Sequence, residues 1–150
     1  SLMMETLDSN FHLALDVASL SQVRDWIAQQ NYLPPLIITL EGDLGAGKTE
    51  WVRQFVSVHG GDAQIVTSPS YSLHNIYELS NGLRVDHWDL YRISNVDELE
   101  GIGFWEHLQE PGFVLLEWPA VLGALKVDFP VLMIRIEKIS PTTVRILTSR

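Results

Sequence analysis

Cysteine is absent from this sequence of 150 residues. The absence excludes a disulfide scaffold and a thiolate metal site, and it favours a cytoplasmic location. Long apolar runs are also missing, because no stretch approaches the ~18 residues that a membrane-spanning helix requires. No N-terminal segment combines a charged start with an apolar stretch, so we expect neither a secretory signal nor a membrane partner.

Positive charge is scarce as well. Ten Lys and Arg residues stand against 19 Asp and Glu residues, which gives a net charge of −9 when the histidines are neutral. A protein that holds nucleic acid by itself needs basic side chains against the phosphates. We therefore expect any RNA involved in the function to be held by another molecule.

The length and the 46% hydrophobic content predict one domain over residues 1–150 with a sizeable core. Ser1 and Leu2 precede Met3 and are expected to be left over from cloning. Segments 36–40 and 113–116 are apolar or β-branched throughout, which is typical of strands covered on both faces of a parallel sheet. Other expected elements are strands over 11–17, 131–136 and 144–147, and helices over 19–30, 48–59 and 96–108.

Segment 71–90 differs from this parallel core. Asn81-Gly82 lies between two extended stretches, which is a strong signal for a hairpin turn. We therefore expect an antiparallel hairpin over these residues. Together the patterns predict the α/β class, with a mostly parallel sheet and an antiparallel hairpin addition.

The most informative stretch is GDLGAGKTE, from Gly42 to Glu50. Its glycines, Lys48 and Thr49 match the spacing G-x-x-x-x-G-K-[ST] between a buried strand and an amphipathic helix. Backbone without Cβ atoms lets successive N–H groups point at a phosphate, and the helix N-terminus adds partial positive charge. Lys48 can reach the β- and γ-phosphates, and Thr49 can offer its hydroxyl to Mg²⁺.

We therefore predict a site for ATP or ADP with Mg²⁺ on this loop. A guanine-specific site is disfavoured, because the chain contains no Asn-Lys-x-Asp signature. The nucleotide-binding residues predicted in this stretch are Asp43, Leu44, Gly45, Ala46, Gly47, Lys48, Thr49 and Glu50.

A loop of this kind needs a carboxylate at the end of a neighbouring core strand to hold Mg²⁺, directly or through water. Asp86 and Glu117 are the two candidates. Residues 83–90 alternate, which predicts a hairpin strand with one wet face, whereas 113–116 is apolar on both faces and belongs beside 36–40. The pattern therefore favours Glu117, the alternative being a solvent-exposed glutamate at a strand end.

The stretch HWDLYR, residues 87–92, is unusually polar for a strand end. Asp89 could orient water or metal, or it could be a surface aspartate paired with Arg92, and the pattern alone does not choose. His87-x-Asp89 could also form a transition-metal pair, but two ligands are too few and the other four histidines are scattered along the sequence.

Two further positions stay open at this stage. Ser68 and Ser70 lie in a loop that could sense a γ-phosphate, or they could simply form a turn with the intervening proline. Trp118, directly after Glu117, could stack on a base or could pack against the protein.

Four motifs, GDLGAGKT, SPSYSL, HWDLYR and LLEWPA, occur in this order between residues 42 and 120. Together they resemble the TsaE family, also called YjeE, whose members are the small ATPase subunit of the bacterial machinery that makes threonylcarbamoyladenosine at position 37 of tRNA. The resemblance implies a P-loop NTPase-like, three-layer α/β fold and ATP or ADP with Mg²⁺ as cofactors.

The resemblance also implies roles for single residues. Lys48, Asp89 and Glu117 are the expected catalytic residues, with Thr49 and Glu117 on the metal. Trp118 is expected near the nucleotide, and Ser70 takes the place of the family's switch-like threonine. Tyr71, Glu50 and Ala120 replace the family's usual phenylalanine, threonine and acidic residue, and none of these changes removes a required group.

By resemblance, the partner is the threonylcarbamoyl-transferase complex, with subunits of TsaD and TsaB type, and contact with tRNA is indirect. We expect an accessory ATPase that is slow alone. The alternative is a small-molecule kinase of the P-loop type, but such a kinase needs a lid with arginines. Only Arg92 among the arginines outside the 48–59 helix lies in a motif, and no long insertion could form a lid.

Overall fold

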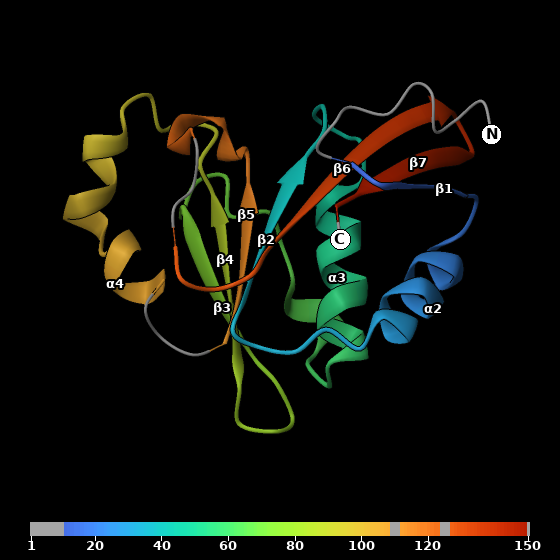
Figure 1. Cartoon of the computed structure of the whole chain (residues 1–150), viewed down its shortest axis with the longest axis horizontal. Helices are drawn as coiled ribbons and strands as arrows, with labels where there is room; N and C mark the ends of the chain where they lie inside the picture. Colours follow the sequence, from blue (N-terminus) through green and yellow to red (C-terminus); the bar gives the residue numbers. More distant parts are fainter. Residues whose placement is uncertain (1–10, 109–111, 124–126, 150) are drawn as a thin grey trace.

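The computed structural model describes residues 11–108, 112–123 and 127–149. One mixed sheet with the strand order β1-β7-β6-β2-β5-β4-β3 runs through the molecule (Figure 1). The expectation for Ser1 and Leu2 lies outside the described residues. This fold confirms the predicted α/β class with its hairpin addition.

The strands and the main helical elements of the described residues have the following bounds. The strands are β1 (Leu13–Val17), β2 (Leu36–Glu41), β3 (His74–Glu78), β4 (Arg84–Asp89), β5 (Phe113–Glu117), β6 (Val131–Ser140) and β7 (Thr143–Thr148). The α-helices are α2 (Leu20–Gln30), α3 (Lys48–Val58) and α4 (Phe104–Leu108), and η2 (Val96–Ile102) is a 3₁₀ segment before α4.

Four strands form the parallel centre of the sheet. β2 pairs in parallel with β6 on one side and with β5 on the other, and β5 pairs in parallel with β4. The predicted hairpin closes one edge, where β3 pairs antiparallel with β4. A second antiparallel addition, β7 and β1, covers the opposite edge and was not predicted from the sequence.

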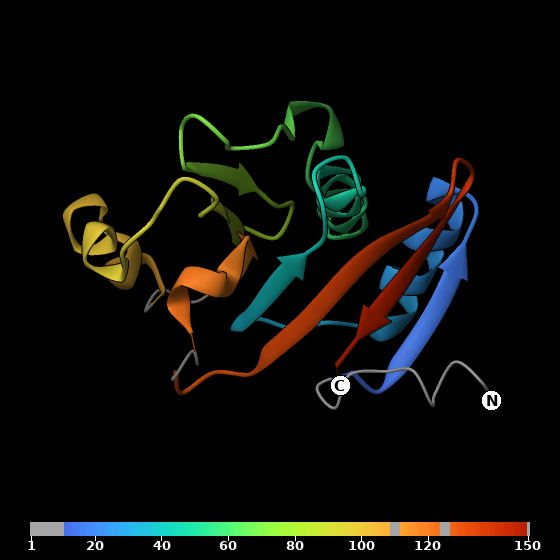
Figure 2. The same cartoon turned by 90° about the horizontal axis from the view of Figure 1, so that it is seen from above.

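Helices cover both faces of the sheet, which gives three layers (Figures 1 and 2). On one face, α2 and α3 pack on a large core that includes Trp51, Phe55 and Leu115. On the other face, η2 and α4 pack on a smaller core that includes Trp88, Phe104 and Leu116. Because side chains alternate along a strand, each central strand contributes to both cores.

The predicted wet face of 83–90 is wrong. β4 lies between β5 and β3, and its residues from Val85 to Asp89 are all buried. Asp86 and Trp88 point away from α3, as the alternation indicates, but η2 and α4 cover that face. An alternating pattern reports two different faces and cannot say whether a helix covers the more polar one.

Local signals set the ends of several elements. Ser19 caps α2 and forms a capping box with Gln22, and Gly60 follows α3 with a φ of 86°. The single helix expected over 96–108 is interrupted at Gly103, which has a φ of 75°. None of the helices among the described residues is long and apolar enough to cross a membrane.

Candidate functional site

The glycine-rich loop joins the end of β2 to the start of α3, as the motif requires. Gly42 has a φ of 153°, and a Cβ placed there would lie 2.6 Å from the Ile136 carbonyl oxygen on β6. Gly47 precedes α3 in a left-handed conformation with a φ of 111°. Only glycine satisfies both conditions, so the loop path depends on these two residues.

Lys48 is the first residue of α3 and is buried, with 6% of its surface exposed. Its Nζ donates to the carbonyl oxygen of Gly42 and lies 3.4 Å from that of Asp43. Burial lowers the pKa of the ammonium, and the negative charges of Glu117 and Asp89, with that of Asp43, oppose this shift. The lysine is therefore held among acceptors at the base of the loop.

The two candidate carboxylates of the site lie side by side at the ends of neighbouring strands. Asp89 on β4 and Glu117 on β5 are register partners in a parallel pair. Parallel strands end at the same edge of a sheet, and β2 delivers the loop to that edge. The sheet thus brings Asp89 and Glu117 close to Lys48 at this edge.

Glu117 is buried, so the alternative of an exposed glutamate at a strand end is wrong. Its Oε2 lies 2.6 Å from Nε2 of His87, and Nδ1 of His87 lies 2.9 Å from the Tyr77 hydroxyl. This buried chain orients the Glu117 carboxylate and leaves its second oxygen for another partner. The sequence analysis missed His87 and Tyr77 in this role, although His87 shares a strand face with Asp89.

Asp89 is also buried, so it is not a surface residue paired with Arg92. Its Oδ1 accepts from the Tyr91 backbone N–H at 2.9 Å, and its Oδ2 accepts from the Ser70 hydroxyl at 3.1 Å. Ser68 lies 3.5 Å from the same oxygen and 2.8 Å from Ser70. The loop with the two serines is therefore linked to the Asp89 carboxylate by hydrogen bonds.

Arg92 interacts elsewhere. Its guanidinium lies over the Tyr71 ring, 4.3 Å from the ring centroid. Tyr71 is 85% exposed, so this pair lies at the surface beside the serine loop.

Trp118 connects the lysine with an open cavity. Its ring lies under the Lys48 ammonium, 3.8 Å from Nζ to the ring centroid, and 4.9 Å from the Tyr91 ring. Trp118 also lines a cavity of about 790 Å³. The other linings are residues 41–46, residues 119–120 and the β6 segment 135–138. The cavity has the size of a small-molecule site and lies directly beside the glycine-rich loop.

The remaining loop residues are placed as follows. Thr49 is half-buried in the first turn of α3, directly after Lys48. Leu44 is 72% exposed at the loop tip, and Ala46 is buried beneath it. The Glu50 side chain forms an ion pair with Arg53, one turn further along α3.

Asp86, the other candidate for the metal, lies apart from this constellation. It lies three positions before Asp89 on β4, so its side chain points to the opposite face of the sheet, which α4 covers. Its carboxylate binds His74 and Arg84. Glu117 is therefore the carboxylate that shares a face with Lys48, although the argument from a wet strand face was wrong.

A glycine-rich loop between a central parallel strand and a helix, with carboxylates at the ends of two neighbouring strands, is the arrangement of a P-loop NTPase-like fold. The family model described as "Threonylcarbamoyl adenosine biosynthesis protein TsaE" matches residues 14–146. The chain belongs to the TsaE family, which acts in the biosynthesis of threonylcarbamoyladenosine in tRNA.

Relatives agree with this placement. The chain is 37% identical over 96 residues to the TsaE protein of Rickettsia typhi, which covers 64% of the chain and 65% of that protein. It is 41% identical over 86 residues to the TsaE protein of Bacillus subtilis, which covers 57% of the chain and 51% of that protein. The matched segment thus spans between half and two thirds of these curated relatives.

A solved structure shows the same fold. The crystal structure of YdiB from Bacillus subtilis superposes with a TM-score of 0.63 at 25% identity, covering 91% of this chain and 84% of that one. The superposition therefore covers a larger share of this chain than the sequence matches to the curated relatives do.

Proposed function

We propose that this protein binds ATP with Mg²⁺ at the Gly42–Glu50 loop and hydrolyses it, as an accessory ATPase of tRNA threonylcarbamoyladenosine biosynthesis. The observation that carries the proposal is the convergence of Lys48, Asp89 and Glu117 at one edge of the sheet. Two carboxylates and one buried ammonium beside a helix N-terminus are the groups that phosphoryl transfer needs.

We expect the triphosphate to bind at the loop because the positive charge that attracts it is concentrated there. The chain carries a net charge of −9, so the general field repels an anion. Lys48 and the first N–H groups of α3 supply the attraction at the loop itself. When the phosphates bind, the Lys48 ammonium exchanges the Gly42 carbonyl for phosphate oxygens, which are the stronger acceptors.

The side chains present also suit Mg²⁺, which prefers oxygen ligands. Thr49 would offer its hydroxyl and Glu117 the carboxylate oxygen that does not face His87. The bound ion would neutralise charge on the phosphates. His87 would keep the Glu117 carboxylate in place, because a buried hydrogen bond fixes its rotamer.

Asp89 has a different role in this proposal. Its oxygens are both engaged by Tyr91 and by the serines, so it is well positioned but has little freedom to turn toward a metal. We assign it to orienting the attacking water. Ser70 then links the Asp89 carboxylate to the exposed loop around Tyr71, through which a bound partner would act on the site.

The partner proposed is the threonylcarbamoyl-transferase complex with TsaD- and TsaB-type subunits, and tRNA would contact that complex and not this chain. A cation supplied by a partner can add about 10³ to 10⁵ in rate to a P-loop enzyme. We therefore expect the isolated chain to hydrolyse ATP slowly.

A reconstitution tests this function. ATP turnover is measured for the chain alone, with tRNA alone, with the transferase complex, and with the complex and tRNA together. The expected result is slow turnover that rises only when the complex is present. Fast turnover by the isolated chain, or turnover that requires a small phosphate acceptor, would replace the proposal with a stand-alone enzyme or a kinase.

A further inference from the structure

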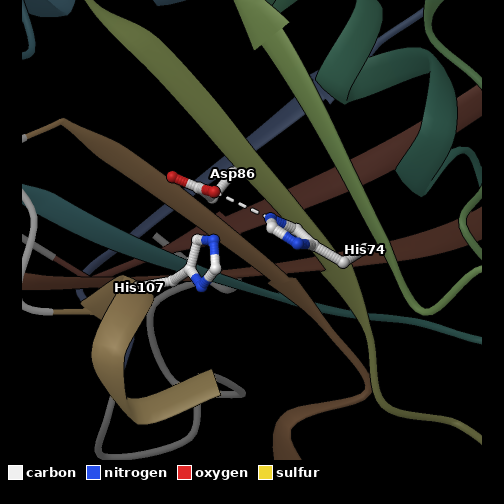
Figure 3. A group of neighbouring side chains, drawn as sticks. All are labelled: His74, Asp86 and His107. Atoms are coloured by element: carbon white, nitrogen blue, oxygen red, sulfur yellow. Dashed lines mark hydrogen bonds and ion pairs between the residues drawn. The ribbon is translucent and has the colours of Figure 1, made fainter. Parts of the chain in front are cut away.

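A second cluster of chemically reactive side chains lies on the opposite face of the sheet from the phosphate-binding loop. His74 on β3, Asp86 on β4 and His107 on α4 point toward one another (Figure 3). One potential ligand atom from each residue lies within 4.8 Å of the other two. These residues are separated by 12 and 21 positions in the sequence, so only the fold brings them together.

Each of the three side chains is oriented by a further group. Arg84 donates its Nε–H to Oδ2 of Asp86 at 3.1 Å, which leaves Oδ1 facing His74 at 2.7 Å. Nδ1 of His107 lies 2.9 Å from the Gly103 carbonyl oxygen. That bond places the proton on Nδ1 and leaves the lone pair of Nε2 directed at the cluster, as in histidines that bind metals.

The third ligand is fixed by stacking. The His74 ring lies parallel to the Trp88 ring at a centroid distance of 3.9 Å and an interplanar angle of 2°. The His107 ring contacts the edges of His74 and Trp88. Trp88 thus forms a rigid wall, so the two imidazoles need little reorganisation to bind an ion.

We propose that His74, Asp86 and His107 form a binding site for a divalent transition-metal ion, and we take Zn²⁺ as the ion. Two imidazole nitrogens and one carboxylate oxygen are a donor set that Zn²⁺ accepts in tetrahedral sites, with water in the fourth position. Mg²⁺ and Ca²⁺ prefer all-oxygen sites, so the two histidines select against the ion of the nucleotide site.

The observed geometry requires only small adjustments. Ligand atoms about 2.0–2.2 Å from a tetrahedral Zn²⁺ lie roughly 3.3–3.5 Å from one another. His74 and Asp86 would separate slightly from their present hydrogen bond, and His107 would approach both. The half-buried imidazoles give the ion a path from solvent, whereas Asp86, 2% exposed, keeps the negative charge inside.

The charge balance also permits a cation. The Asp86 carboxylate is the one acidic group among the three ligands, and Arg84 carries the opposite charge on its other oxygen. The Arg84 side chain is 31% exposed, so solvent screens much of its repulsion toward an ion. Its Nε–H prevents Asp86 from rotating and therefore contributes to the shape of the site.

An ion at this position would fasten α4 to the β3–β4 hairpin. The α4 helix has only five residues, and the metal would add a bond between it and the two strands. Asp89 follows Asp86 on β4 but faces the other side of the sheet. The metal site is therefore independent of the proposed ATPase function, and it would stabilise the strand that carries Asp89.

The test measures Zn²⁺ binding by calorimetry, with excess Mg²⁺ and without nucleotide, on the whole chain. We expect one Zn²⁺ per chain and a rise in the unfolding temperature on binding. His74→Gln and His107→Gln should each weaken binding at least tenfold and abolish that rise. His12→Gln is the matched control. His12 is exposed and directly precedes β1, at the edge of the sheet opposite β3, so this variant should bind Zn²⁺ as the parent chain does.

Co²⁺ gives a second readout that a purely structural role would not produce. A tetrahedral Co²⁺ site gives intense visible absorption, which we expect for the parent chain and the His12→Gln variant only. If either glutamine variant fails to fold by circular dichroism, the other variant and the parent chain decide. Absence of stoichiometric binding in the parent chain, or binding unchanged in both folded variants, would show that the cluster is only a hydrogen-bonded pair stacked on Trp88.

Discussion

The ammonium group of Lys48 lies over the indole ring of Trp118, with 3.8 Å between Nζ and the ring centroid. The same group donates to the Gly42 carbonyl oxygen, so it contacts both the glycine-rich loop and Trp118, the residue that follows β5. Two separate parts of the proposed nucleotide site are thus held together by one cation. Phosphate binding would compete for that cation, which makes both residues sensitive probes of the site.

Removing the cation should weaken nucleotide binding. We expect Lys48→Ala to lower ATP affinity roughly tenfold to hundredfold, because a charge-assisted hydrogen bond to phosphate contributes about 1.5–3 kcal/mol. Calorimetry measures the effect. Lys138→Ala is the matched control, since Lys138 lines the adjacent cavity but lies outside the loop. Equal losses in the two variants would mean that the attraction is general and not centred on the loop.

Trp118 fluorescence should change when ATP or ADP binds, because Lys48 leaves its ring for the phosphates. The chain has four other tryptophans, so the signal must be assigned with Trp118→Phe. Trp105→Phe is the control, because Trp105 packs on the opposite face of the sheet. We also expect ATP and ADP to bind better than GTP and GDP. A nucleotide-dependent signal that survives in Trp118→Phe would contradict the proposed movement.

Exchanging the carboxylates should separate their roles. Glu117→Gln keeps an acceptor for His87 but removes the charge. We therefore expect the factor by which Mg²⁺ raises the ATP affinity to fall roughly tenfold or more. Asp86→Asn should leave that dependence unchanged, because Asp86 faces the α4 side of the sheet. A Mg²⁺ titration in which the Asp86 variant is the defective one would reverse the assignment.

Asp89→Asn should lower ATP hydrolysis more than ATP binding. Asparagine retains the bond from the Tyr91 N–H but loses the charge that would orient water. Comparing single-turnover rates with calorimetric affinities measures the two effects separately. Ser70→Ala should produce a smaller loss of rate, since Ser68 can still donate to the same oxygen. A variant that loses affinity and rate equally would indicate a role in ground-state binding.

Gly42→Ala should destabilise the protein and weaken ATP binding. The added Cβ would meet the Ile136 carbonyl oxygen at 2.6 Å, so the loop and β6 must separate. Gly82 also has a positive φ, 79°, but a Cβ there would meet no atom within 4 Å, so Gly82→Ala should cost only about 1 kcal/mol of backbone strain. Thermal unfolding of both variants checks the difference, and equal shifts would mean that strain alone matters at Gly42.

Some features were determined by local sequence. The spacing of Gly42, Gly47 and Lys48 predicted a glycine-rich loop between a strand and a helix, and the structure places it between β2 and α3. The continuous apolar strands at 36–40 and 113–116 specified neighbours in a parallel core, and the structure pairs them as β2 and β5. Asn81-Gly82 specified a hairpin. Each of these signals depends on residues within a few positions of one another.

Other features depend on contacts between distant segments. The order of strands places β4 between β5 and β3, where its residues from Val85 to Asp89 are buried. The alternating pattern of this strand had predicted one solvent-exposed face. The same order aligns Asp89 with Glu117 and gives Glu117 its partner His87, 30 positions earlier. A residue pattern records which side chains share a face, but not which element covers that face.

The histidines show this difference most clearly. In the sequence they are scattered, and only His87, two positions before Asp89, suggested a metal pair. The fold instead gives His87 to Glu117 and gathers His74 and His107 around Asp86. The sequence determined the loop because its residues are contiguous, whereas the second cluster exists only because the packing of α4 on the hairpin brings ligand atoms of three distant side chains within 4.8 Å of one another.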